Sequence, residues 1–415
     1  MKRLLIVSPS FLPSTSADMH RVRLLAPYAH ARGWALEILC VRPEDHGAPQ
    51  DPTLLAAFPD DIPIHRVPSP SARWHRWLGM GSLYRRCRPA LQTAGDRLLM
   101  ERAFDLVYFS STAFDTFTLG PRWRRHFGVP FVLDYQDPWR NDYYRRQRIR
   151  PPGGWLKFSL GQLPARWREP AVLRMAAGIT AVTPRYVDDL KRRYGVIPPS
   201  RVLPFPADLT PLPELALRVP RTWTSVGRGG TDLQPAAAAL AAAMSALSSD
   251  AKTALQGLEL RFIGTSYAPA GQGIPSIAPG LNVPSEFRVT EQTERVPVAD
   301  ARARQAESER LIALLSDDPG YQPSKLAGLI QSGKPLLIVA PRAHRVHSDL
   351  ANVTGVVCLP IDPHAVFSAS DVKALLAPTA PAWTDAHRAA FDPQHHAEAL
   401  FAFFEEVFFA QKVRR

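Results

Sequence analysis

Two short segments in the second half of the chain carry residues suited to holding a phosphate group. The first is Val226-Gly227-Arg228-Gly229-Gly230-Thr231-Asp232, between a predicted strand and an alanine-rich predicted helix. Glycines let a backbone approach a phosphate closely, and the N-terminus of a helix favours an anion. The second is Ser324-Lys325, at the start of another predicted helix. Arg228 and Lys325 would supply two positive charges, although the glycines alone would equally fit a tight turn.

A group of polar residues follows a predicted strand in the first half of the chain. The strand covers residues 131–133, and Asp134, Gln136 and Asp137 come after it. Binding and catalytic residues of parallel α/β sheets gather at the carboxyl ends of strands. A carboxylate there can accept a proton from a hydroxyl group, and we expect Asp137 to do so, with Asp134 as second candidate. The alternative is that Asp137, before Pro138, only starts a turn.

Length and composition predict folded domains and exclude several other classes of protein. The chain has 415 residues, 46% of them hydrophobic and 21% charged, which is enough for two domains. No apolar run is long enough to cross a bilayer, and the apolar run at residues 4–7 is too short for a signal peptide. Three scattered cysteines exclude a disulfide scaffold and a cysteine-rich zinc site, so we expect a cytoplasmic protein.

The excess of positive over negative charge lies in the first half of the chain. Residues 1–200 hold 30 lysines and arginines against 17 acidic residues (+13), and the remainder holds 20 against 21 (−1). Six of the nine tryptophans lie among these arginines, between Trp74 and Trp167, as in Arg73-Trp74-His75-Arg76-Trp77. Aromatic and basic residues together suit an anionic membrane surface. A solvated basic face is the alternative; nucleic acid is not expected, since no nucleic-acid-binding motif accompanies the charge.

Apolar runs alternate with helical patterns along the whole chain, which is typical of parallel α/β sheets. In the first half, strands are predicted at residues 4–7, 35–41, 106–109, 131–133 and 179–182, and helices at 22–31 and 184–194. In the second half, strands are predicted at 222–226, 258–263, 287–289, 311–315, 335–339 and 356–359, and helices at 235–247, 324–332 and 397–409. We therefore predict two doubly wound Rossmann-like domains, over residues 1–200 and 221–395, joined by a proline-rich linker at 201–220.

Several motifs occur in the order found in a known enzyme family. They are Ser8-Pro9-Ser10-Phe11-Leu12-Pro13, Arg21 to Trp34, Phe104-Asp105-Leu106-Val107, Gly128 to Trp139, Tyr321-Gln322-Pro323-Ser324-Lys325-Leu326 and Gly333-Lys334-Pro335-Leu336. Together they resemble the GT-B-fold glycosyltransferases, in particular family-four-like bacterial enzymes of surface-polysaccharide clusters. The resemblance implies two domains facing a central cleft, an acceptor-side first domain, a second domain that binds a nucleotide-sugar, and a last helix (397–410) that packs back on the first.

The resemblance also implies roles for individual residues. The polar loop over residues 10–20 would face the cleft, and Arg228 matches the family's arginine at the donor pyrophosphate. The acceptor-side candidates are Asp18, His20, Arg21, Gln136 and Trp139. The donor-binding candidates are Gly227, Arg228, Gly229, Gly230, Ser324 and Lys325. For Asp18 the alternative is an ordinary helix N-cap, and where the family often carries a His-Asp pair this chain has Gln136-Asp137.

A pair of glutamates common in the family is missing here. Members carry two glutamates eight positions apart, the second of which usually binds the donor ribose. The corresponding positions hold Gly320 and Gly328. Glu291, Glu294 and Asp318 are candidate substitutes.

The sequence thus predicts a hexosyltransferase-like enzyme that moves a sugar from a nucleotide-diphosphate sugar to a glycan, a lipid-linked acceptor or another hydroxyl in cell-surface polysaccharide synthesis. We expect no cofactor and no metal, since Arg228 and Lys325 would neutralise the leaving diphosphate. Expected partners are the nucleotide-sugar, the acceptor and the inner face of the plasma membrane. The alternative is a catalytically silent GT-B protein that binds a nucleotide or a partner enzyme.

Overall fold

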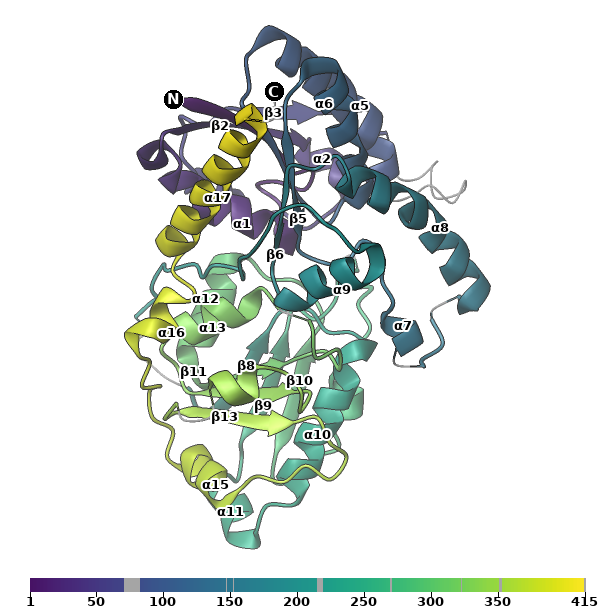
Figure 1. Ribbon diagram of the computed structural model, residues 1–415. Helices are drawn as coiled ribbons and strands as arrows, with labels where there is room; N and C mark the ends of the chain where they lie inside the picture. The colour runs from purple at the N-terminus through teal and green to yellow at the C-terminus, as the bar shows by residue number, and fades with distance from the viewer. Residues whose placement is uncertain are drawn as a thin grey trace. The chain divides into compact units, whose positions relative to one another are not determined.

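The computed structural model describes the chain except for residues 71–82, 147, 152, 215–218, 269–270, 322, 351–352 and 414–415. It divides into two compact units, Met1–Pro206 with Pro393–Arg415, and Ala207–Asp392. Each unit is built around one sheet whose strands pair in parallel (Figure 1). The predicted linker, residues 201–220, overlaps a strand at each end. One strand ends inside it at Val202, and the next begins inside it at Val219.

The sheet of the first unit has the order β3-β2-β1-β4-β5-β6-β7. Its strands are β1 (Lys2–Val7), β2 (Trp34–Val41), β3 (Ile64–Val67), β4 (Leu106–Ser110), β5 (Phe131–Tyr135), β6 (Gly178–Ala181) and β7 (Ser200–Val202). The chain moves outward from β1 to β3 and then returns to the other side of β1 with β4. Such a reversal places binding residues at the carboxyl ends of the two strands beside it, here β1 and β4.

Helices cover both faces of this sheet. They are α1 (His20–Leu25), α2 (Pro43–His46), α3 (Pro52–Ala56), α5 (Leu83–Glu101), α6 (Leu119–Phe127), α7 (Tyr143–Arg146), α8 (Gly154–Leu173) and α9 (Pro184–Tyr194). The prediction of a single helix over residues 22–31 is wrong. The structure instead has α1 followed by 3-10 turns at Ala26–Tyr28 and His30–Arg32, because Pro27 has no amide hydrogen to continue an α-helix.

The sheet of the second unit has the order β10-β9-β8-β11-β12-β13. Its strands are β8 (Val219–Val226), β9 (Glu259–Ile263), β10 (Arg288–Gln292), β11 (Ser308–Leu314), β12 (Leu336–Ala340) and β13 (Val356–Pro360). Its helices are α10 (Gln234–Ser245), α11 (Ser249–Ala254), α12 (Val298–Glu307), α13 (Lys325–Gln331), α14 (Val346–Asp349), α15 (Ala369–Leu376) and α16 (Asp385–Ala389). The order reverses between β8 and β11, so the segments after these two strands lie at the expected ligand site of the sheet.

The last helix, α17 (Pro393–Val413), belongs to the first unit although the second unit separates the two in sequence. One face of the helix is buried through Leu400, Phe401, Phe403, Phe404, Val407 and Phe408. The Phe404 ring lies 5.0 Å from that of Tyr108 on β4 and 5.9 Å from that of Trp34 on β2. The helix therefore completes the core on its face of the first sheet, as the yellow ribbon in Figure 1 shows.

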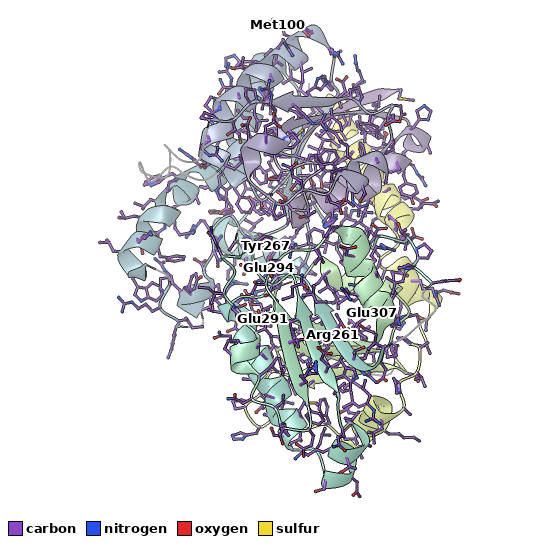
Figure 2. All side chains as sticks on the ribbon, turned by 180° about the vertical axis from the view of Figure 1, so that it is seen from behind. Met100, Arg261, Tyr267, Glu291, Glu294 and Glu307 are labelled. Atoms are coloured by element: carbon purple, nitrogen blue, oxygen red, sulfur yellow. The ribbon has the colours of Figure 1, made fainter. Side chains whose placement is uncertain are left out.

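Replacing Phe404 by alanine tests this contribution. Phe404 is fully buried, and truncating such a ring costs about 3–5 kcal/mol of stability. We expect Phe404→Ala to lower the urea midpoint of the first unit accordingly. Met100→Ala is the control in the same unit, since Met100 is 74% exposed on α5 (Figure 2) and should change stability by about 0.5 kcal/mol or less. Equal losses for the two variants would contradict the packing described here.

Candidate functional site

The glycine-rich segment that follows β8 needs its glycines for the path of the chain. Gly227 and Gly230 have φ angles of 133° and 140°, which side chains with a Cβ rarely adopt. A Cβ at Gly229 would lie 2.3 Å from the Ser276 Oγ. The Gly230 amide donates a hydrogen bond to the same Oγ at 3.0 Å. This loop is thus pressed against the segment around Ser276, at the reversal point of the second sheet.

The side chain of Arg228 is held in a fixed orientation beside this loop. Its guanidinium donates two hydrogen bonds to the Asp232 carboxylate, at 2.9 and 2.8 Å. It also lies over the Tyr321 ring, 5.4 Å from the ring centre. The hydrogen bonds from Asp232 raise the pKa of Arg228, so it stays charged at every working pH. Asp232 and Tyr321 were not predicted from the sequence as partners of Arg228.

Lys325, the first residue of α13, places a second cation against the same loop. A Cβ at Gly227 would lie 3.7 Å from the Lys325 Nζ. Burial, together with the nearby charges of Arg228 and Arg295, lowers the pKa of Lys325 to about 8. Within the described part of the chain, the structure gives this ammonium no hydrogen bond or ion pair. Three cations therefore surround the loop, and Asp232 offsets only part of their charge.

Arg295 is a member of this cation group that the sequence analysis missed. It follows β10, and its guanidinium donates to the Gly264 carbonyl at 3.0 Å and lies over the Tyr267 ring at 4.7 Å. No spacing rule links Arg295 to Arg228 or Lys325, because the three residues meet only through the sheet order. Ser324, predicted at the donor site, precedes α13 and is half-buried, and its hydroxyl does not cap the helix.

Glu291 anchors the loop that supports the glycines. Its carboxylate accepts hydrogen bonds from the Thr265 hydroxyl at 2.6 Å and from the amides of Ser276, Ile277 and Ala278 at 2.7–3.0 Å. Burial alone would raise the pKa of Glu291, but these hydrogen bonds hold it below its usual value. Figure 2 shows Glu291 and Glu294 at one end of the second-unit sheet. Because its oxygens are taken up by the backbone, Glu291 has a structural role rather than that of a free ribose ligand.

Gly320 and Gly328 occupy the positions where the family carries its two glutamates. Gly320 is buried, and its amide donates to the Asp318 carboxylate at 3.0 Å, so Asp318 closes the turn before α13. Gly328 lies on the exposed side of α13, and a Cβ there would meet nothing within 4 Å. Space is therefore available at Gly328, and the absent carboxylate is not a consequence of packing. Glu294 remains an exposed candidate.

A buried ion pair dominates the predicted acceptor side of the first unit. Arg21 and Asp134 are both fully buried, and the Arg21 Nε donates to the Asp134 carboxylate at 2.9 Å. Asp134 also accepts hydrogen bonds from Ser110, Gln136 and Thr180 at 2.7–3.0 Å. Both carboxylate oxygens of Asp134 accept hydrogen bonds, and the side chain is fully buried. Asp134 therefore links neighbouring strands of the sheet and is not a candidate base.

Asp18 and Gln136 belong to the same buried network. The Asp18 carboxylate accepts from the Ser111 hydroxyl at 3.0 Å, and its backbone carbonyl accepts from the Gln136 amide at 3.0 Å. Burial raises the pKa of Asp18. The alternative assignment of Asp18 as a helix N-cap is wrong, because Ser16 precedes the 3-10 turn Ala17–Met19 that contains it. The structure thus brings Asp18, Arg21 and Gln136 together, but inside the protein.

The remaining candidates of the first unit differ in exposure. Trp139 is buried, with its ring 6.0 Å from that of Phe114 and 5.6 Å from that of Phe117, so it is a core residue. His20 begins α1 and is half-buried. Asp137 is half-buried in the bend that follows β5, near the carboxyl edge of the sheet. Asp137 is therefore the candidate base that remains accessible, and a turn at Pro138 is compatible with that role.

Within the described part of the chain, no group of three or more His, Cys, Asp or Glu residues is placed to hold a metal ion. The same part contains no helix that is long and apolar enough to span a bilayer. The three cysteines form no disulfide, and burial raises the pKa of each thiol to about 12. Such thiols are poor nucleophiles at neutral pH.

Two parallel α/β domains with these strand orders define the class of protein: the chain has the GT-B fold. A sucrose-phosphate synthase from Thermosynechococcus elongatus aligns with a TM-score of 0.58 and 14% identity over 100% of this chain and 98% of that chain. An α,α-trehalose 6-phosphate synthase from Burkholderia multivorans aligns with a TM-score of 0.61 and 12% identity, again over 100% and 98%. The predicted fold class is thereby confirmed.

A comparison of the sequence with protein-family models indicates a more specific family for part of the chain. Residues 20–208 match the family model described as a glycosyl transferase 4-like domain, which bears out the resemblance to that group for this part of the chain. A search of curated proteins found no match.

The fold alone does not fix the reaction. The Anabaena protein HepE, solved in complex with UDP and glucose, aligns with a TM-score of 0.53 and 13% identity over 97% of this chain and 95% of that chain. A protein described as a UDP-N-acetylglucosamine 2-epimerase from Listeria monocytogenes aligns with a TM-score of 0.51 and 10% identity over 98% of both. The activity therefore has to be argued from the residues of the site.

Because the pKa of Lys325 is lowered, we predict that replacing this lysine by an uncharged residue stabilises the ligand-free protein. Its pKa of about 8 in the folded state lies below the value of about 10.4 in an unfolded chain. The charged form is therefore disfavoured by folding at pH 8 and below, and this penalty disappears as the pH rises to about 10.5. We expect Lys325→Met to raise the stability of the second unit by about 1–3 kcal/mol at pH 7 and by almost nothing near pH 10.5.

Urea unfolding at the two pH values measures this difference. Lys373→Met is the matched control, because Lys373 is exposed on α15 of the same unit. A Lys325→Met variant that is less stable than the wild type at pH 7 would show that the ammonium has a stabilising partner, and the interpretation of the cation group would fail.

Proposed function

We propose that the protein is a glycosyltransferase that transfers a sugar from a nucleoside-diphosphate sugar to an acceptor hydroxyl. The observation that carries the proposal is the group of three cations, Arg228, Lys325 and Arg295, around the glycine loop at the reversal point of the second sheet. A pyrophosphate is the ligand that such a loop and such charges fit. The glycosyl transferase 4-like match of residues 20–208 supports the same reaction class.

The leaving diphosphate carries the charge that the second unit would stabilise. When the bond from the anomeric carbon to the phosphate oxygen breaks, negative charge develops on that oxygen. Arg228 is already oriented by Asp232 and Tyr321, so little reorganisation is needed when this charge appears. Among the residues that the structure describes, none forms an ion pair with Lys325, and the diphosphate would supply one. In this proposal the two side chains do what a metal ion does elsewhere, so no metal is required.

Asp137 is the proposed base on the acceptor side. It lies at the carboxyl edge of the first sheet and stays accessible, whereas Asp134 is enclosed in its ion pair with Arg21. A carboxylate in this place would orient the acceptor hydroxyl or remove its proton. The proposed acceptor is a glycan or a lipid-linked glycan in cell-surface polysaccharide synthesis, made at the cytoplasmic side of the membrane. That part of the proposal depends on the family resemblance and on the basic first half of the chain.

One observation favours a second function. No carboxylate stands at Gly320 or Gly328, and Glu291 is committed to the backbone. A GT-B protein without a ribose ligand could bind a nucleotide, or a partner enzyme, without turnover. The two functions differ in whether a nucleotide-sugar is consumed, and the measurements below separate them.

Nucleotide binding is the first measurement. Thermal shift across a panel of nucleoside diphosphates and their sugars should show one base that stabilises the second unit, by about 2.7 kcal/mol at a concentration of 100 times the dissociation constant. Arg228→Ala and Lys325→Met should each weaken that ligand by about 10- to 100-fold, because each removes a charged contact to phosphate. The affinity of the wild type should also fall as the pH rises above 8, since Lys325 loses its charge there.

Arg342→Ala is the control for these variants, because Arg342 is 76% exposed and its ion pair with Asp362 is also exposed. It should bind the nucleotide like the wild type. A flat response of the folded wild type to every nucleotide would reject nucleotide-sugar chemistry altogether.

Replacing the proposed base separates chemistry from binding. Asp137→Asn keeps the shape of the side chain and removes its basicity, so kcat should fall by about 10²- to 10⁴-fold. The affinity for the nucleotide should stay the same, because the residue belongs to the first unit. Sugar transfer from the radiolabelled donor found in the panel measures the rate. An unchanged kcat would exclude Asp137 as the base, and wild type that binds the donor without turnover would favour the silent GT-B protein.

A further inference from the structure

One helix of the first unit exposes an apolar stripe to solvent. On α8, Leu156, Leu160, Leu163 and Trp167 are 76%, 55%, 40% and 79% exposed. Their spacing of four, three and four residues places them on one face of the helix. Figure 1 shows α8 along the outer side of the first unit. An exposed apolar stripe of this length marks an interaction surface.

The opposite face of α8 already has its partner inside the unit. Ala165, Glu169 and Val172 are buried there, again at spacings of four and three residues. The helix therefore does not need the exposed stripe in order to pack on its own unit. Exposing these leucines and the tryptophan costs solubility, so the stripe calls for an explanation outside the fold.

Basic residues flank the stripe. Residues 143–174 contain eight arginines and lysines and a single acidic residue, Glu169, which lies on the buried face. At 100° per residue, Lys157 falls on one side of the stripe and Arg166 on the other. Asp115 pairs with Arg168 at 2.7 Å and Asp189 pairs with Arg146 at 3.2 Å. Residues 143–174 together with Asp115 and Asp189 thus carry a net charge of +5.

The short helix α7 extends this surface. Its Tyr144 ring lies 5.4 Å from that of Phe158 on α8, and Trp155 contacts Phe158 in turn at 6.1 Å. The segment between the two helices exposes Ile149, between Arg148 and Arg150. Trp155 and Trp167, towards the two ends of the stripe, have the amphipathic rings that are favoured at a membrane interface.

The geometry points to the surface formed by α7 and α8 as a docking site for an anionic lipid bilayer. The apolar stripe enters the boundary between headgroups and acyl chains, and the flanking arginines and lysines contact lipid phosphates. A second copy of the chain fits this face less well, because a symmetric contact would bring two sets of like charge together. The docking site lies on the first unit and does not depend on the proposed donor chemistry.

Two tryptophans expected at such a surface do not belong to it. Trp123 and Trp139 are buried in the core of the first unit, so that part of the sequence-based surface is wrong. The cluster from Arg73 to Trp77 lies outside the described residues. The docking surface is therefore defined by the positions on α7 and α8.

Vesicle flotation of the full chain tests this surface. We expect wild type to float with vesicles of phosphatidylcholine and phosphatidylglycerol at low salt and to remain behind with pure phosphatidylcholine. The double variant Leu160→Gln with Trp167→Ser should lower the vesicle-bound partition about tenfold or more, because two large apolar side chains no longer enter the bilayer. Lys157→Glu with Arg166→Glu should lower it similarly at low salt and less at high salt.

Ile274→Ser with Val366→Ser is the matched control, because both residues are exposed, at 81% and 62%, on the second unit. It should float like the wild type. All variants should keep the wild-type urea midpoint and nucleotide affinity, which separates loss of docking from loss of folding or of donor binding. Wild type that does not float at low salt, or α8 variants that float normally, would overturn the proposal. So would a wild-type dimer in light scattering that the α8 variants convert to monomer.

Discussion

The buried ion pair between Arg21 and Asp134 is the constraint on which the first unit depends. It joins α1 to the end of β5, and the same carboxylate holds Ser110 at the end of β4 and Thr180 on β6. Arg21 also donates to the Leu203 carbonyl, beyond β7. Two charges removed from water are tolerated when they pair with each other, and losing one partner leaves the other uncompensated. The pair therefore fixes the strand ends that carry Asp137 on one side and the loop containing Asp18 on the other.

The second unit follows the opposite electrostatic rule. Its three cations meet around a glycine loop, where Asp232 pairs with Arg228, and Lys325 forms no ion pair within the described part of the chain. The charge of Lys325 lowers stability at this point, whereas Arg21 and Asp134 neutralise each other's charge. The two units thus show that the same residue types serve structure when their charges are paired and can serve ligand binding when their charges are not fully paired. Glu291 makes the second arrangement possible, because it fixes the loop on which the glycines rest.

Most strands could be predicted, and most of the side-chain partnerships could not. Buried parallel strands are short apolar runs between turn signals, so β1, β2, β4 and β12 are visible in the sequence. The edge strands β3 and β7 carry few apolar residues and so have no clear pattern, and α8 contains Gly161, Pro164 and Pro170, which disfavour a helix. The glycine loop was found because glycines mark a special backbone. Arg295 was missed because only the sheet order brings it to Lys325, and Asp134 looked reactive because its burial is not written in the local sequence.

The placement of α17 has a consequence for biosynthesis. The first unit leaves off at Pro206 and is completed only at Pro393, after the whole second unit. At translation rates of about 5–20 residues per second, roughly 10–40 s separate the two events. During that interval Trp34 and Tyr108 lack the phenylalanines that cover them in the finished protein. The first unit of the nascent chain therefore exposes part of its apolar core until α17 has been synthesised.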